Sequence, residues 1–254
     1  MKKNTFFGIL YGASGSLWWG TLGVLYFKSA SFVGPIELVV HRTIWTAFTL
    51  IITTSIFSKW TNFFSLIKKS KEIIYLFVTG FLIFCNWSTW IYAVATNKLI
   101  DASFGYFIMP ILSVFFGIIF LKEPYNKQKI TSILLVLISV LYLLFNFASV
   151  PWTGLIVAIT WSTYSLLRKK ISVESDIGLL VESLFITPLA LFIFYIISID
   201  GNYYFSFTNP KTAFWLFLAG PMTVIPLFLF LKGVDLAGLG TSGMIFFLTP
   251  TCQF

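Results

Sequence analysis

Long apolar stretches alternate with short polar ones along the whole chain. About nine stretches of roughly 20 residues carry almost no charge, and short polar or basic segments separate them. Because about 20 mostly apolar residues are needed for a helix to cross a bilayer, each stretch predicts a membrane-spanning helix. The predicted helices cover residues 6–27, 36–57, 73–96, 102–121, 129–147, 152–167, 177–199 and 212–231, and the ninth begins near residue 236 and continues to Phe254.

The composition supports a membrane protein. Of the 254 residues, 58% are hydrophobic and only 10% are charged, and the mean hydropathy is +0.91. A soluble domain is about 25% charged, so little of this chain could face water. The net charge of +8 fits the lysine and arginine excess of cytoplasmic loops and does not require a nucleic acid. We therefore predict an all-α, polytopic helix bundle whose surroundings are the lipid bilayer.

The basic residues of the predicted loops indicate the orientation. If the N-terminus lies in the cytoplasm, thirteen lysines and arginines fall in inside loops and only three, Lys28, Lys98 and Lys211, in outside loops. Cytoplasmic loops collect positive charge, so we predict a cytoplasmic N-terminus. The apolar run at 6–27 is longer than the core of a signal peptide, which predicts that it remains as the first helix.

A weak internal repeat organises these helices. An offset of 140 residues aligns YLFVTGFLIF (75–84) with WLFLAGPMTV (215–224) and Pro110 with Pro250, with about seven identities in thirty-eight pairs. The repeat unit is five helices, and an odd number makes the second copy enter the membrane from the opposite side. We predict an inverted repeat, residues 1–147 and 148–254, in which the second copy lacks the end of helix nine and helix ten. The alternative is a natural nine-helix protein.

Several motifs resemble a known group of carriers. They are PIELVVHRTIW (35–45), NW (86–87), NKLIDASFGYFIMP (97–110), FLKE (120–123), LLRKKI (166–171) and GLLVESL (178–184). With these motifs the chain resembles the drug/metabolite transporter superfamily, in its EamA branch, and within that branch the RarD group. The resemblance implies a ten-helix carrier of the bacterial inner membrane that exports small metabolites or drugs.

Ionisable residues gather in the second predicted helix. Such groups are costly in a bilayer and usually face the bundle interior or an aqueous cavity. Glu37 and His41 are four residues apart and share a face, whereas Arg42 lies on another face. On the functional interpretation Arg42 binds an anionic group, and His41 or Glu37 exchanges a proton. On the structural interpretation Glu37 caps the helix and Arg42 reaches the headgroups.

Glu182 is the counterpart of this cluster on the seventh helix. An offset of 141 residues puts it opposite His41. The seventh helix runs the other way, so we expect Glu182 near the inner face, where it would suit alternating access. The alternative is an ion pair with the basic segment at residues 168–170.

Two further helices carry candidates for the pathway. Asn86 and Trp90 share one face of the third helix. On one interpretation Asn86 contacts the substrate and Trp90 forms an aromatic wall beside it. On the other, Asn86 makes a hydrogen bond to a neighbouring helix. Tyr106 and Pro110 lie in the fourth helix, and Pro110 removes a backbone hydrogen bond there. Glu123 and the lysines around it are expected to be solvated.

These residues predict a secondary transporter for a small molecule, with proton-coupled efflux as the expected mode. No nucleotide motif of the form GxxxxGK[ST] occurs, and Cys85 and Cys252 have no metal-ligand spacing, so no cofactor or metal is predicted. The alternatives are an intramembrane lipid-modifying enzyme or a channel. The sequence predicts neither a substrate nor an oligomeric state.

Overall fold

The computed structural model describes residues 3–96, 98–146, 150–171, 173–201, 203–206 and 208–253. Every regular element within these ranges is helical. The elements are α1 (Lys3–Trp18), the π-helical turn η1 (Trp19–Gly23), α2 (Val24–Ser29), α3 (Pro35–Ile56), α4 (Trp60–Ile67), α5 (Ser70–Ala95), α6 (Leu99–Leu121), α7 (Lys127–Asn146), α8 (Trp152–Lys170), α9 (Ser175–Ile199), α10 (Pro210–Ala237), α11 (Leu239–Ile245) and α12 (Leu248–Gln253).

The predicted all-α membrane bundle is confirmed. Helical structure lies at each predicted position, and α1, η1 and α2 follow one another without a gap. Among the described residues, five helices are long and apolar enough to cross a membrane: Pro35–Ile56, Ser70–Ala93, Ile100–Leu121, Ser175–Ile199 and Pro210–Ala237. The ninth predicted helix is divided into α11 and α12, next to Pro250, which has no N–H to donate to residue 246. The predicted repeat boundary, at residues 147 and 148, lies outside the described residues.

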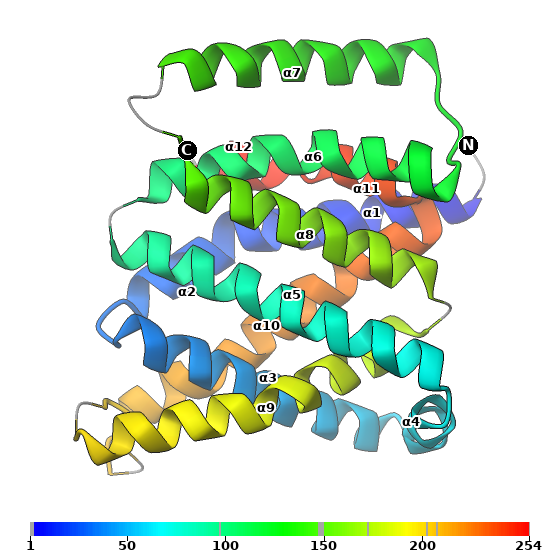
Figure 1. Cartoon of the computed structure of the whole chain (residues 1–254). Coiled ribbons are helices and arrows are strands. Elements are labelled where there is room, and N and C mark those ends of the chain that lie inside the picture. The colour runs from blue at the N-terminus through cyan, green and yellow to red at the C-terminus, as the bar shows by residue number, and fades with distance from the viewer. Residues whose placement is uncertain are drawn as a thin grey trace.

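The short helix α4 was not predicted from the sequence. Its eight residues are too few to cross a bilayer, and they lie between the second and third predicted helices. Trp60 and Phe63 on this helix nevertheless pack against the interior of the bundle. Figure 1 shows α4 nearly end-on, crossing the direction of the long helices.

The long helices pack side by side through small residues. α1 packs on α10, α10 on α3, α3 on α9, α5 on α8 and α9, and α6 on α8 and α11. A Cβ atom at Gly233 would clash with Gly12, and one at Gly154 would clash with the carbonyl oxygen of Asp101. Glycine at these two positions lets α10 approach α1 and α8 approach α6 closely. α7 contacts α6 and lies at the margin of the bundle in Figure 1.

Different helix ends and connections lie at the two ends of the bundle (Figure 1). The amino-terminal end holds the start of α1, α4 and the turn between α8 and α9, and the far end holds the α2–α3 and α9–α10 connections.

Glu123 lies at the amino-terminal end and is not simply solvated. Its carboxylate accepts the backbone N–H groups of Leu239 (2.6 Å) and Gly240 (2.9 Å), so it caps the start of α11.

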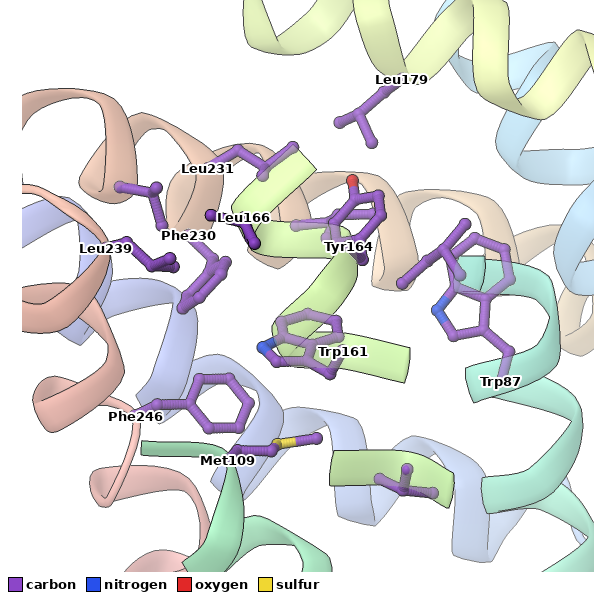
Figure 2. Close-up of a cluster of buried hydrophobic side chains, with 14 of the residues drawn as sticks. Trp87, Met109, Trp161, Tyr164, Leu166, Leu179, Phe230, Leu231, Leu239 and Phe246 are labelled. Atoms are coloured by element: carbon purple, nitrogen blue, oxygen red, sulfur yellow. The ribbon is translucent and has the colours of Figure 1, made fainter. Parts of the chain in front are cut away.

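Aromatic side chains form the centre of the bundle. The Trp161 ring of α8 lies 5.1 Å from Phe230 of α10 and 5.4 Å from Phe246, which follows α11. Figure 2 shows these three rings next to one another, with Met109 of α6 beneath them. These two pairs are tilted, and Phe230 and Phe246 meet edge to face at 5.4 Å. An edge-to-face pair is worth about 0.5–1.5 kcal/mol beyond its burial. The three rings join three helices around the centre.

Candidate functional site

A cavity lies inside the bundle, between its middle and its far end. It is small, with a volume of about 50 Å³. We call it the central cavity. It is lined by Trp19, Gly23, Val24, Phe27, Arg42, Asn86, Trp87, Trp90, Tyr106, Met109, Trp161, Phe246 and Thr249.

The position of the central cavity follows from where its residues lie along their helices. Phe27 is near the end of α2, Trp90 is near the end of α5, and Tyr106 is in the first half of α6. All three helix segments lie toward the far end of the bundle (Figure 1). The central cavity is therefore displaced from the amino-terminal end.

Among the described residues, Arg42 is the one charged residue that lines the central cavity. The residue is only 5% exposed. Its Nε donates a hydrogen bond to Thr223 Oγ1 (2.9 Å), and its guanidinium carbon lies 4.4 Å and 5.0 Å from the ring centroids of Trp87 and Phe27. No carboxylate pairs with it in the part of the chain that is described. A buried guanidinium with N–H groups to spare can bind an anionic group of a ligand.

Asn86 and Trp90 of α5 and Tyr106 of α6 also line the central cavity. The amide nitrogen of Asn86 donates to the carbonyl oxygen of Val157 (2.9 Å) and to Thr160 Oγ1 (3.0 Å). The interhelical hydrogen bond is therefore present, and Asn86 lies on the cavity wall as well. The indole nitrogen of Trp90 is buried without a hydrogen-bond partner among the described residues.

Glu37 and His41 lie outside this lining, at the far end. The Glu37 carboxylate accepts the backbone N–H groups of Tyr204 (2.9 Å) and Phe205 (2.8 Å). His41 Nε2 lies 3.7 Å from Glu37 Oε1, and Trp45 Nε1 donates to His41 Nδ1 (3.2 Å). An indole N–H can only donate, so a neutral His41 carries its hydrogen on Nε2, on the side of Glu37. Together these contacts fasten α3 to the α9–α10 connection.

Glu182 belongs to a separate buried cluster toward the amino-terminal end. Its Oε1 accepts a hydrogen bond from Thr79 Oγ1 (2.6 Å) and lies 3.4 Å from Arg168 Nη1, and Tyr164 donates to Oε2 (3.3 Å). Arg168 also donates from Nη2 to the carbonyl oxygen of Ser175 (3.0 Å). The cluster joins α5, α8 and α9. The sequence-based alternative, an ion pair with residues 168–170, is present in this arrangement.

The predicted site residues are thus divided among separate places. Arg42, Asn86, Trp90 and Tyr106 meet at the central cavity, and the remaining candidates do not line it. Pro110 is buried within α6, one turn beyond Tyr106, and is not part of the lining.

Sequence reasoning missed the cavity residues Trp87 and Trp161. With 20% of the chain aromatic, no periodicity separates cavity-facing rings from those that face lipid or core. The partner of Glu182, Arg168, belongs to the basic segment that the sequence offered as the alternative, and it lies in the last turn of α8.

The fold and the cavity define a multi-pass helical membrane protein with an internal, partly polar site. Comparison with known proteins adds the family. Residues 6–145 match the EamA-like transporter family. The chain is 31% identical to "Protein RarD" of Escherichia coli (strain K12) over 252 residues, which are 99% of this chain and 85% of that protein.

Two other relatives give the same result. "Protein RarD" of Salmonella typhi is 32% identical over 252 residues, 99% of this chain and 85% of that protein. "Uncharacterized transporter YojE" of Bacillus subtilis (strain 168) is 32% identical over 247 residues, 96% of this chain and 82% of that protein. The chain belongs to the EamA-like transporter family, and the predicted resemblance to this family and to RarD is confirmed. It is a membrane transporter of the drug/metabolite transporter superfamily.

Proposed function

We propose that this transporter moves small metabolites or drugs out of the cell by alternating access, with the central cavity as its binding site. The observation that carries the proposal is Arg42, a buried charge on the cavity wall with no counter-charge among the described residues. Burying an unpaired charge is costly, and such residues inside membrane bundles usually mark a substrate pathway. A residue kept only for packing would not need the charge.

The difference between the two ends of the bundle supports alternating access. The central cavity lies toward the far end, whereas the Arg168–Glu182 pair lies toward the amino-terminal end. On the surface of that end, Lys59 Nζ lies 2.6 Å from Asp176 Oδ2 and 2.9 Å from Glu174 Oε2. We infer that these contacts hold the amino-terminal end closed in this conformation and separate when the other conformation forms.

The helix contacts are consistent with the inverted repeat, residues 1–147 and 148–254. α1 packs on α10 as α8 packs on α5, and α3 packs on α10 as α9 packs on α5. The pairs α3–α9 and α6–α11 join equivalent helices of the two halves. A two-fold axis between the halves would produce these pairings, and it would relate two conformations that open to opposite sides. The loop charges support an inner-membrane protein with a cytoplasmic N-terminus.

Protons are the proposed coupling ion, through His41 and Glu182. Protonation of His41 at Nδ1 would remove the acceptor of the Trp45 hydrogen bond and strengthen the attraction to Glu37. Since Glu37 also holds the backbone of Tyr204 and Phe205, this change would act on the α9–α10 connection. Protonation of Glu182 would remove the counter-charge of Arg168.

The test is an uptake screen of metabolites and antibiotics in proteoliposomes, with and without an imposed pH gradient. We expect saturable, gradient-driven uptake that falls about tenfold or more in Arg42→Gln. Loss of the gradient effect is expected in His41→Gln, and Lys98→Gln, which removes an exposed charge, is the control. Non-saturating flux would indicate a channel, and chemical change of a lipid or solute would indicate an enzyme. Either outcome would refute the proposal.

A further inference from the structure

The polar atoms on the wall of the central cavity are mostly donors. Arg42 carries the one charge there, Tyr106 has a hydroxyl group, and Trp90 has a buried N–H without a partner among the described residues. No Asp or Glu of the described part of the chain lines the cavity, and both amide hydrogens of Asn86 are used between α5 and α8. The Asn86 oxygen is a neutral acceptor and does not balance an ammonium group. The wall therefore favours a ligand that accepts hydrogen bonds and carries negative charge.

The aromatic side chains could instead suggest a cation, because aromatic faces attract ammonium groups. The position of Arg42 argues against this. Its guanidinium already occupies the faces of Trp87 and Phe27, at 4.4 Å and 5.0 Å. A second cation in the same cavity would meet like charge in a low-dielectric site, which is strongly unfavourable.

The size of the cavity and its aromatic wall select the body of the ligand. The cavity is small, with a volume of about 50 Å³. The rings of Trp19 and Trp161 meet edge to face at 5.2 Å and form part of its wall. A flat ring can enter between aromatic side chains that shift by small rotations, whereas a bulky aliphatic group requires the helices to move apart.

We propose that the central cavity binds an organic monoanion: a flat aromatic or otherwise planar apolar body bearing one carboxylate, which pairs with Arg42. This substrate class rests on the transport role proposed above. It excludes amines, and it disfavours amino acids, because the lining offers no carboxylate for their ammonium group. The planar fork of Arg42 can engage both oxygens of a carboxylate while its Nε stays bonded to Thr223.

The experiment uses four compounds with one phenyl ring and one chain length. They are 3-phenylpropionate (anion), 3-phenylpropylamine (cation), L-phenylalanine (zwitterion) and 3-phenylpropanol (neutral). Binding to the purified full chain is followed by quenching of tryptophan fluorescence, because Trp19, Trp87, Trp90 and Trp161 line the cavity. Uptake of radiolabelled 3-phenylpropionate into proteoliposomes is measured in parallel.

We expect the anion to bind about tenfold or more tightly than the other three compounds. Arg42→Gln should remove this preference, Arg42→Lys should retain part of it, and Lys98→Gln should leave it unchanged. Equal or tighter binding of the amine, the amino acid or the alcohol would overturn the proposal. So would a preference that survives in Arg42→Gln. Binding of the anion without uptake would support the binding class and refute the transport role, so the two failures can be told apart.

Discussion

Arg42 and Arg168 are the two arginines of the chain, and both are buried, but their partners differ. Arg168 pairs with the Glu182 carboxylate at 3.4 Å and donates to the Ser175 carbonyl. Arg42 has a hydroxyl group and two aromatic faces for partners and no carboxylate among the described residues. The charge of Arg168 is balanced within the protein, although its Nε and Nη1 have no hydrogen-bond partner among the described residues. The charge of Arg42 has no counter-charge there and is left for a ligand.

This difference shows that burial of a charge does not by itself identify a binding site. A buried ion pair contributes little net stability, but removing one partner is strongly destabilising because the other charge is left uncompensated. A buried cation without a counter-charge in the protein is different, because its removal leaves no uncompensated charge behind. The four predictions below test this difference, beginning with the largest expected effect.

Glu182→Gln is expected to lower the free energy of unfolding by about 3–5 kcal/mol, because it leaves Arg168 buried without its counter-charge. Thermal and urea unfolding in detergent measure this. The double variant Glu182→Gln/Arg168→Gln is the control, and it should recover most of the loss. Wild-type stability of the single variant would mean that Arg168 does not depend on Glu182.

Gly178→Ala is expected to destabilise the protein by about 1–3 kcal/mol through overpacking. A Cβ atom at Gly178 would fall on the guanidinium of Arg168 and push it from its position. Gly23→Ala is the matched change at the central cavity, where the nearest atom to an added Cβ is 3.5 Å away. It should leave the unfolding temperature almost unchanged. Similar losses of stability in the two variants would contradict the distinction between Arg168, which the protein holds in place, and Arg42, which faces the central cavity.

Arg42→Gln should change the free energy of unfolding by about 1 kcal/mol or less, since the aromatic contacts it loses are offset by removal of an unpaired buried charge. Glutamine can keep a hydrogen bond to Thr223. The same unfolding measurements apply, together with the binding of 3-phenylpropionate. A loss as large as that of Glu182→Gln would assign Arg42 a structural role.

Lys59→Gln removes the exposed ion pairs of the amino-terminal end and should cost about 0.2–1 kcal/mol. Burial acts to lower the pKa of Lys59, but hydrogen bonds from its ammonium to Asp176 and Glu174 outweigh burial and raise that pKa. A raised pKa means that the stabilisation is complete below the ordinary lysine pKa of about 10.4 and is lost as pH rises through the higher folded value.

The check is the difference in unfolding temperature between wild type and Lys59→Gln at neutral pH and above pH 11, at low and high salt. The difference should shrink at high pH and at high salt. Lys98→Gln is the control. An effect independent of both pH and salt would show that Lys59 acts through packing instead of charge.

Much of the fold could be predicted from the sequence because a bilayer imposes a simple rule. Apolar runs of about 20 residues must form helices, since backbone groups find no water in the bilayer core. The runs at 36–57 and 177–199 accordingly lie within two residues of the observed α3 and α9. α4 was missed because that rule gives no signal for a helix of only eight residues.

The site was predicted only in part. Rarity of charge in a membrane segment was enough to select Arg42 and Glu182. The sequence could not separate the roles of these two residues, because a counter-charge comes from a neighbouring helix and the sequence does not show which helix that is. The tertiary structure places Arg168 beside Glu182, Tyr204 and Phe205 beside Glu37, and Trp87 beside Arg42.

The sequence by itself therefore determined the class of protein, the long helices and the ionisable residues within apolar segments. Each of these depends only on composition and on the length of a segment, and not on which helices pack together. Only the tertiary structure decided which of those polar residues are satisfied by the protein and which face a cavity. That outcome depends on helix pairs such as α3 with α10 and α5 with α9, which bring together residues far apart in the chain. No periodicity within one helix records the identity of its neighbour.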